Sequence, residues 1–540
     1  MCGIWAVIGK LHRGLISPEA ALAALKARGP EYAAVGEAGP VTLGFTRLAI
    51  NGLTPAGHQP FGSGATHLVC NGEIYNYKQL AERYAIPLEE GTSDCAVLPA
   101  LANALPPAEF CRALDGVFAL VLVDLAHDSV LVARDPYGVR PLFYATADDT
   151  TFFASEIKAL PRSLEPKVFP PSSYAIYKAS TGELLEIQQY HHVPTVQLPI
   201  FSYPYYRQEA KIALKEALCS AVKKRLMSDR PIGALLSGGL DSSLVAAIAA
   251  RELKRQGRRL STFSIGMPGS TDLVFAEKVA KYIDSDHHTI LLKPQDFLDA
   301  IPEVVRAIES YDITSVRASV GNYLLGKYIK NNTDIKVVFN GDGSDEIGGG
   351  YLYFYEAPSD EAFEAESERL LKEIHLYDVL RSDRSMAAHG LEARTPFLDK
   401  AVVATWRSIA TGFRRPRKPS VEGRGSAMEK QILREAFELE TLLPFEVIWR
   451  KKEAFSDGVS SVEDSWYKRC GSYAAAQGVD LSEATTYIHN PPRTEEALLY
   501  RKLFEAAYGP QAATVIPAMW LPRWIVGATD PSARTLSGLY

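Results

Sequence analysis

Short runs of β-branched and aromatic residues alternate with turn residues over the first part of the chain. The clearest runs occupy residues 41–50, 67–76, 117–125 and 129–138 and are bounded by Gly, Asp or Pro. β-branched and aromatic side chains favour extended backbone, whereas Gly, Pro and Asp favour turns. We therefore expect a strand-rich first domain with a few helices.

The hydrophobic period changes after residue 206. Residues 207–227 place their apolar side chains at helical spacing, and residues 231–236 resemble a strand that leads through a short loop into a second helix. Further strand-like runs follow at 260–266, 287–292 and 335–340, with a helical stretch that ends at Ile283 between the first two. Alternating strands and helices predict a parallel sheet, and the remainder of the chain is typical of helices.

Residues 192–206 separate the two patterns. They contain three prolines and show no clear hydrophobic period, which is typical of a linker. A chain of 540 residues also exceeds what one hydrophobic core usually serves. We therefore expect a first domain at 1–191, a linker at 192–206 and a second domain at 207–540.

Composition excludes several classes of protein. The chain has 58 Lys and Arg against 64 Asp and Glu, so its net charge of −6 does not attract nucleic acid or anionic lipid. No apolar run reaches membrane-spanning length, and the first residues lack the pattern of a secretory signal. The six cysteines include no CxxC pair, so neither a disulfide framework nor a zinc site is indicated. We expect a cytoplasmic enzyme that acts on small molecules.

Cys2 is a candidate nucleophile. If Met1 is removed, Cys2 carries both a thiol and a free α-amine with a pKa of about 7.7 to 8.0, and this amine can act as the general base for the thiol. Gly3 follows and leaves room for the backbone beside the nucleophile. On its own, a cysteine after the initiator methionine is more often a chance occurrence.

Polar residues further along supply groups that amide hydrolysis requires. The Asn71 side-chain amide and the Gly72 backbone N–H can stabilise an oxyanion. Arg47 can pair with a substrate carboxylate, and Glu73 and Asp94 can hold an α-ammonium group. Taken separately, each of these residues is more often part of a turn or the surface.

The ordered motifs of the first domain resemble those of a known family. They are MCGI (1–4), TRLAI (46–50), GHQP (57–60), NGEIYNY (71–77), TSDCAV (92–97), LDGVFAL (114–120) and ARDPYGVRPLFY (133–144). This set is similar to the glutaminase domain of the N-terminal-nucleophile amidotransferases, which implies an α+β domain with an αββα sandwich. The resemblance implies Cys2 as nucleophile and Asn71 with Gly72 as oxyanion hole. It implies a glutamine site formed by Arg47, Leu48, Ala49, Ile50, Asn51, Asn71, Gly72, Glu73 and Asp94.

One loop of this domain departs from the family pattern. The family usually has His-Arg-Gly-Pro-Asp where this chain has Ala27-Arg28-Gly29-Pro30-Glu31. This loop normally helps to close the glutamine site, so Ala27 and Glu31 bear on how the loop closes it.

A second candidate site lies in the predicted parallel sheet. In SGGLDSS (237–243), Gly238 and Gly239 allow backbone N–H groups to approach a phosphate at the start of a helix. The loop lacks the GK[ST] ending of a Walker loop, so we expect release of pyrophosphate rather than transfer of a γ-phosphate. GDGSDE (341–346) also follows a predicted strand, so both loops can meet at the carboxyl edge of one sheet, where acidic side chains can bind Mg²⁺ or an amino group. In isolation, either loop would more often be a solvated turn.

Further motifs extend the resemblance over nearly the whole chain. They are YDITSVRAS (311–319), GGYLYFYEAP (349–358), LEARTPFLDK (391–400), MEKQILREAF (428–437) and WRKKEAFSDGV (449–459). With both domains matching in order, the chain is similar to the family of glutamine-hydrolysing asparagine synthetases. This resemblance implies an α/β second domain with a parallel sheet of the adenine nucleotide α-hydrolase type. The implied reaction makes asparagine from aspartate, glutamine and ATP through a Cys2 thioester, transferred ammonia and β-aspartyl-AMP, in a homodimer that uses Mg²⁺.

The resemblance also assigns roles in the second site. It implies an ATP site formed by Leu235, Leu236, Ser237, Gly238, Gly239, Asp241, Ser242, Ile265, Asn340 and Gly341. It implies Asp345 and Glu346 at the aspartate, Asp241 and Asp345 at the metal, and Asp342 and Lys430 as catalytic residues. The basic, Pro- and Gly-rich residues 412–430 are consistent either with a solvated loop or with a flap that brings Lys430 over the phosphates.

Two alternatives stay open at this stage. Asn340 and Asp342 stand where family members usually have Ser and Glu, which keeps alive an amidotransferase of the same architecture that amidates a different carboxylate. A catalytically silent glutamine or nucleotide sensor is the other alternative. Retention of Cys2, Asn71, Asp241 and Lys430 together argues against the sensor, because a binding module does not need a nucleophile.

Overall fold

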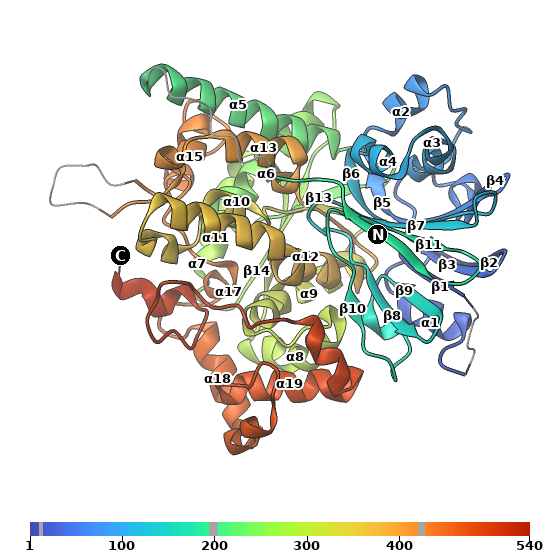
Figure 1. Cartoon of the computed structure of the whole chain (residues 1–540). Helices are drawn as coiled ribbons and strands as arrows, with labels where there is room; N and C mark the ends of the chain where they lie inside the picture. The colour runs from blue at the N-terminus through green and yellow to red at the C-terminus, as the bar shows by residue number, and fades with distance from the viewer. Residues whose placement is uncertain (10–13, 194–202, 419–426, 540) are drawn as a thin grey trace.

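Three β-sheets organise the chain (Figure 1). The computed structural model describes residues 1–9, 14–193, 203–418 and 427–539. Two six-stranded sheets are built from residues 3–189, and a five-stranded sheet is built from residues 232–394. This division matches the change in hydrophobic period along the sequence.

The first two sheets are antiparallel and lie face to face. The first has the order β10-β8-β9-β1-β3-β2 and the second the order β12-β11-β7-β6-β5-β4. The strands of the first are β1 Gly3–Ile8, β2 Tyr32–Ala38, β3 Val41–Arg47, β8 Phe143–Ala147, β9 Thr150–Ala154 and β10 Lys167–Val168. Those of the second are β4 Phe61–Ser63, β5 Thr66–Ile74, β6 Gly116–Asp124, β7 Ser129–Arg134, β11 Ser173–Lys178 and β12 Leu184–Gln189. The four strands expected from the sequence are therefore confirmed as β3, β5, β6 and β7.

Alternation along β1 explains the layering of this half. Ile4 and Ile8 point into the core between the two sheets, whereas Trp5 and Val7 pack in a cluster with Leu22 of α1 (Pro18–Leu25). On the outer face of the second sheet lie α2 Tyr77–Arg83, α3 Leu98–Ala104 and α4 Pro107–Ala113. The expected αββα sandwich is confirmed.

The third sheet is parallel, with the order β15-β14-β13-β16-β17. Its strands are β13 Ile232–Leu235, β14 Ser261–Gly266, β15 Asp286–Leu291, β16 Val337–Phe339 and β17 Glu392–Arg394. The first four confirm the strands expected at 231–236, 260–266, 287–292 and 335–340. The sequence did not predict β17, which lies in a part of the chain that reads as mainly helical and which pairs with β16 at the edge nearest the first domain.

Helices cover this sheet and complete the second half. The early ones are α5 Tyr203–Lys224, α6 Leu240–Arg255, α7 Thr271–Tyr282, α8 Pro294–Ile308, α9 Ile313–Asn332 and α10 Ser344–Gly348. The later ones are α11 Asp360–Glu373, α12 Asp378–Ala387, α13 Lys400–Ser408, α14 Thr411–Arg414, α15 Gln431–Phe437, α16 Phe445–Ile448, α17 Phe455–Gly458, α18 Trp466–Ala476 and α19 Glu495–Tyr508. α5 begins within the segment expected as a linker, of which residues 194–202 lie outside the described part of the chain. Among the described helices, none combines the length and apolarity that a membrane crossing needs.

Candidate active sites

Cys2 lies between the two sheets of the sandwich, immediately before β1. Its backbone nitrogen donates to Asn71 Oδ1 on β5 at 3.0 Å, and its thiol donates to the Leu48 carbonyl oxygen at 3.8 Å. Burial raises the pKa of the Cys2 thiol, so the thiolate does not form without a base. Asn71 is fully buried, and its Nδ2 has no hydrogen-bond partner within the described residues. A buried amide donor without a partner beside a thiol is suited to an oxyanion.

Residues 47–51 form a buried loop beside Cys2. The Arg47 guanidinium donates to the Thr54 carbonyl oxygen at 2.8 Å and to the Gly52 carbonyl oxygen. Asn51 Nδ2 donates to Glu73 Oε2 at 2.5 Å, so the predicted residues Asn51 and Glu73 are in direct contact. Leu48, Ala49 and Ile50 are also buried.

Asp94 completes the predicted glutamine site. Its carboxylate accepts a hydrogen bond from the backbone nitrogen of Ile74 at 2.6 Å, directly after Glu73. Burial raises the pKa of Asp94 to about 6, and burial together with nearby carboxylates raises the pKa of Glu73. The structure therefore brings Cys2 into contact with Asn71 of β5 and Leu48 of the 47–51 loop, and that loop in turn contacts Glu73.

The unusual Glu31 has a specific place in this site. Its carboxylate accepts from the backbone nitrogen of Ala49 at 2.7 Å and pairs with Arg230 Nη2 at 2.8 Å. Arg230 Nε also donates to the Ala49 carbonyl oxygen at 2.9 Å. Glu31 thus joins the 47–51 loop to the second half of the chain, a role that the sequence did not indicate.

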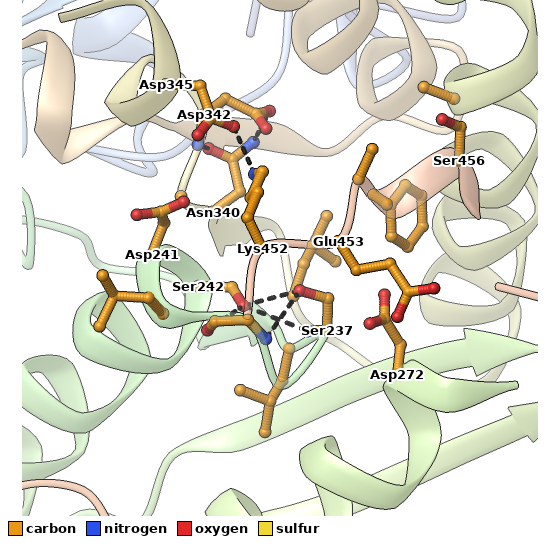
Figure 2. Close-up of a pocket in the computed structure, with 18 of the residues that line it drawn as sticks. Ser237, Asp241, Ser242, Asp272, Asn340, Asp342, Asp345, Lys452, Glu453 and Ser456 are labelled. Carbon is orange, nitrogen blue, oxygen red and sulfur yellow. Dashed lines mark hydrogen bonds and ion pairs between the residues drawn. The ribbon is translucent and has the colours of Figure 1, made fainter. Parts of the chain in front are cut away.

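The second site lies at the carboxyl ends of β13, β14 and β16. A cavity of about 160 Å³ opens here, and Figure 2 shows the side chains that surround it. Nine predicted ATP-site residues line the cavity: Leu235, Leu236, Ser237, Gly239, Asp241, Ser242, Ile265, Asn340 and Gly341. Gly238 does not line it, but its φ of +73° and a Cβ position 2.4 Å from the Ala276 backbone nitrogen leave room only for glycine.

The two loops predicted to meet at this edge are in contact. A Cβ on Gly341 would lie 2.6 Å from the Ser242 backbone nitrogen, and Ser344 Oγ donates to Asp241 Oδ1 at 2.8 Å. Within the first loop, the Gly239 backbone nitrogen donates to Ser237 Oγ at 3.3 Å, which orders the turn before α6. The sheet therefore presents a glycine-rich turn and an acidic turn to the same cavity.

Lys430 joins the acidic residues of these loops. Its ammonium group lies 2.6 Å from Asp241 Oδ2 and 2.6 Å from Asp345 Oδ1, and Lys452 Nζ lies 2.6 Å from Asp345 Oδ2. Although burial opposes it, these two ammonium groups hold the pKa of Asp345 well below its ordinary value. The Asp345 carboxylate is therefore ionised, and it lines the same cavity as Asp241.

Asp342 and Glu346 have different surroundings. Asp342 accepts from Asn340 Nδ2 at 2.8 Å and from Arg381 Nη2 at 2.9 Å, while burial raises the pKa of its carboxyl group. Glu346 accepts from the Tyr351 hydroxyl at 2.6 Å and does not line the cavity. Asp342 is thus held at the cavity wall, whereas Glu346 lies behind Tyr351.

Comparison with known proteins adds an independent observation. The glutamine amidotransferase domain matches residues 1–188, and the asparagine synthase family matches residues 213–367 and 356–524. Chicken glutamine-hydrolysing asparagine synthetase is 42% identical over 99% of this chain and 98% of its own. The mouse and human proteins of the same name are 43% and 42% identical, each over 99% of both chains. The chain belongs to the glutamine-hydrolysing asparagine synthetase family. The resemblance seen in the sequence is thereby confirmed.

Several cavity residues of this family member were not identified from the sequence. Besides Lys452 and Arg381, they include Arg450, which pairs with Asp272 at 2.8 Å and donates to the Ser237 carbonyl oxygen at 3.4 Å. Burial raises the pKa of Asp272 to about 7. Figure 2 shows Asp272, Glu453 and Ser456 on one side of the cavity and Asp241, Asp342 and Asp345 on the other. The charged run at 450–453 was the available signal, but its spacing alone assigned no role.

Strand β17 connects the two sites of this synthetase. Arg394 Nη2 pairs with Glu73 Oε2 at 3.3 Å, and the Arg394 carbonyl oxygen accepts from the Asn340 backbone nitrogen at 3.1 Å. One residue of β17 therefore contacts the predicted glutamine residue Glu73 through its side chain and the cavity residue Asn340 through its backbone.

Proposed function

We propose that this chain makes L-asparagine, L-glutamate, AMP and diphosphate from L-aspartate, L-glutamine, ATP and water. In the first half, Cys2 cleaves the glutamine side-chain amide and forms a glutamyl thioester that water hydrolyses. In the second half, ATP and aspartate form β-aspartyl-AMP, which the released ammonia converts to asparagine. This is an ATP-dependent carbon–nitrogen ligase with glutamine as nitrogen donor.

One observation carries the proposal: a single chain holds both a thiol beside a free amide donor and a nucleotide-type cavity with a bridging lysine. The first pair is Cys2 and Asn71, and the second group is Asp241, Lys430 and Asp345. Glutamine hydrolysis alone would need only the first site, and nucleotide binding alone would need only the second. Their presence in one chain is explained by a reaction that consumes in one site what the other releases.

The glutaminase chemistry follows from the surroundings of Cys2. After Met1 is removed, the α-amine takes the thiol proton and the thiolate attacks the glutamine amide carbon. The free Nδ2 of Asn71 and the backbone of Gly72 stabilise the oxyanion. We assign Arg47, Glu73, Asp94 and residues 48–51 to binding the α-carboxylate and α-ammonium groups of glutamine.

The synthetase chemistry follows from the charges of the cavity. The loop at 237–242 contacts the phosphates, and Lys430 and Lys452 stabilise the negative charge that develops during adenylation. Asp345 orients these two ammonium groups toward the cavity. We assign Asp342, held by Asn340 and Arg381, to the aspartate end of the cavity together with Asp345, and Glu346 to a supporting position behind Tyr351.

The carboxyl groups of Asp241 and Asp345 are suited to a magnesium ion. Asp241 and Asp345 both contact the Lys430 ammonium, and carboxylate oxygens are the ligands that Mg²⁺ prefers. When bound, the ion would neutralise phosphate charge.

Further properties of the family complete the proposal. We propose a cytoplasmic homodimer, with domains at 1–191 and 207–540 and a linker at 192–206. The matched residues 1–188 and 213–524 support these boundaries. Residues 412–430, for which a solvated loop and a flap both stay open, include residues 419–426, which lie outside the described part of the chain.

The test is to follow asparagine and diphosphate from purified, Met1-processed protein supplied with aspartate and Mg-ATP. Glutamine is compared with ammonium as nitrogen donor, and a Cys2→Ala variant is included. Asparagine from both donors, with only the glutamine reaction lost in the variant, is the expected result. Glutamine hydrolysis without asparagine or diphosphate from either donor would reject aspartate as the substrate and favour another carboxylate.

A further inference from the structure

The amino-terminal residue lies inside the protein. Met1 is 2% exposed, and its ammonium group lies 3.4 Å from Glu392 Oε2 in a fully buried ion pair. Its sulfur lies 3.7 Å from Arg28 Nη2. Glu392 belongs to β17, so the chain begins in a charged pocket to which the second domain contributes a carboxylate.

Removal of Met1 leaves the α-ammonium group of Cys2 near this carboxylate. Adjacent backbone nitrogens are less than about 3.8 Å apart, so the Cys2 nitrogen lies within about 7 Å of Glu392 Oε2. On its other side, the Cys2 nitrogen donates to Asn71 Oδ1 at 3.0 Å. The new ammonium group therefore has a neutral acceptor in its own domain and an anion in the other domain.

We infer that Glu392 is a positioning residue of the glutaminase site, which stabilises the α-ammonium form of Cys2 and so sets the strength of the base that activates the thiol. The inference rests on the proposed role of Cys2. As the S–H bond breaks, the amine gains the proton and the thiolate attacks the amide carbon. As the C–N bond breaks, the ammonium group returns that proton to the leaving nitrogen. Glu392 takes no proton in either step.

The state of Glu392 suits this role. Although burial opposes it, the Arg394 guanidinium and the amino-terminal charge hold the pKa of Glu392 down to about 2. Glu392 therefore remains an anion over the working pH range and does not compete as a base. Its carboxylate is itself held by Arg394 Nε at 2.8 Å and lies 3.3 Å from Arg140 Nη2.

Other charged groups are buried in the same region as the start of the chain. They are the carboxyl groups of Glu73 and Asp94 and the guanidinium groups of Arg28, Arg47, Arg140 and Arg394. The pKa of Glu73 and that of Asp94 are both raised, and Glu73 Oε2 already accepts from Asn51. Of the carboxyl groups of Glu73, Asp94 and Glu392, that of Glu392 has a lowered pKa. Removing its charge should therefore change the basicity of the amine.

The first experiment measures glutamine hydrolysis against pH for the processed wild type, Glu392→Gln and Glu392→Asp. In a buried site, Coulomb attraction between opposite charges up to about 7 Å apart shifts a pKa by about one unit or more, so the acid limb of Glu392→Gln should move down by about one pH unit. Above pH 8 its rate should fall, by up to about tenfold, because a weaker base activates the thiol less. Glu392→Asp keeps the charge and should restore most of the wild-type profile.

Glu309→Gln is the matched control. Glu309 is also buried and also joins the two halves, because its carboxylate accepts from the Ile157 backbone nitrogen at 2.9 Å. It is not among the groups that surround Cys2, so its variant should keep the wild-type midpoint even if its rate falls. A purely structural role for Glu392 would lower the rate at every pH without moving the midpoint, and that result would overturn the inference.

A second measurement does not depend on glutaminase activity. In a Cys2→Ala protein with Met1 removed, the pKa of the amino-terminal amine is obtained from the pH dependence of its acylation rate. Adding Glu392→Gln should lower this pKa by about one unit, and an unchanged value would overturn the inference. Wild-type protein that hydrolyses no glutamine at any pH would instead reject the proposed function, while the amine titration would still report on Glu392.

Discussion

Asn71 shows how much one side chain can contribute to the first site. Its Oδ1 accepts from the Cys2 nitrogen, which leaves its buried Nδ2 as a free donor beside the thiol. A buried donor without a hydrogen-bond partner lowers the free energy of unfolding. An oxyanion that forms during the reaction would supply that partner. Asn71 is therefore better explained by an oxyanion than by stability.

Replacing Asn71 should separate the two activities. We expect Asn71→Ala to lower kcat for glutamine hydrolysis by about 10²- to 10³-fold, the usual effect of losing one oxyanion donor. Ammonia-dependent asparagine synthesis should be unchanged. Steady-state assays with each donor test this, with Asn76→Ala as control, because both amide atoms of Asn76 are already bonded to backbone groups of residues 113 and 115. Equal loss with both donors would contradict the assignment.

Asp272 gives a pH-dependent prediction. Because burial raises its pKa to about 7, the folded protein binds one proton more than the unfolded chain between about pH 4 and about pH 7. Its contribution to stability is present below about pH 4 and falls as the pH rises to about 7. Asp272→Asn removes this dependence, so its melting temperature relative to wild type should rise between pH 5 and pH 7.5. A constant difference would show that the carboxyl group is ionised throughout.

The turn before α6 is an element whose shape depends on one glycine. Gly238 has a φ of +73°, and a Cβ there would lie 2.4 Å from the Ala276 backbone nitrogen on α7. A clash with backbone cannot be relieved by rotating a side chain, so the loop itself must shift. Displacement of about 1 Å in a site of this kind reduces rate substantially.

We therefore expect Gly238→Ala to lower ATP-dependent diphosphate release by at least about tenfold. Glutamine hydrolysis should persist because the other sheets are untouched. Gly257→Ala is the matched control, since Gly257 has a φ of +70° but no atom within 4 Å of the added Cβ. Equal effects of the two substitutions would indicate backbone strain rather than a change of loop shape.

Elements with a clear hydrophobic period could be predicted from the sequence, whereas short ones could not. β5 and β6 are largely buried runs of nine residues each, and α6 has sixteen residues with a buried apolar face, so each carried a readable signal. β17 has only three residues, Glu392–Arg394, two of them charged. It is a buried strand because its charges pair with the other domain, which no local pattern reveals.

The same limit applied to the two candidate sites. Residues within a motif, such as Asn71 and Asp241, could be named because the motif itself suggests the chemistry. Lys452 and Arg381 lie 107 and 39 residues from the acids that they contact, so their participation depends on the tertiary fold. Glu346 could not be separated from Asp345 by sequence, since only the course of α10 turns one toward the cavity and the other toward Tyr351.

At the scale of the whole molecule, buried ion pairs join the two halves. Asp383 pairs with Arg28 at 2.7 Å and with Arg140 at 3.3 Å, and Arg28 Nε donates to the Cys2 carbonyl oxygen at 2.9 Å. Breaking a buried pair on one side costs about 3 to 5 kcal/mol, because a charge is left without compensation. The position of Cys2 therefore depends on a carboxylate of α12.

Asp383→Asn should affect the two nitrogen donors unequally. We expect lower thermal stability and a larger loss of glutamine-dependent than of ammonia-dependent asparagine synthesis, with more glutamate formed per asparagine. The ratio of these products measures the effect. The control is Asp284→Asn, which removes an exposed pair with Arg259 and should change neither quantity. An unchanged ratio in Asp383→Asn would contradict a role of this interface in joining the two reactions.

The position of β17 late in the chain also orders events during synthesis on the ribosome. The sandwich that holds Cys2 is translated within the first 189 residues, but Glu392 and Arg394 emerge only after about 200 more. At about 5 to 20 residues per second, the glutamine site therefore waits roughly 10 to 40 s for its last contacts. By then most of the parallel sheet has been made. A nascent chain thus completes the contacts of Cys2 only after strands β13 to β16 of the second domain have been translated.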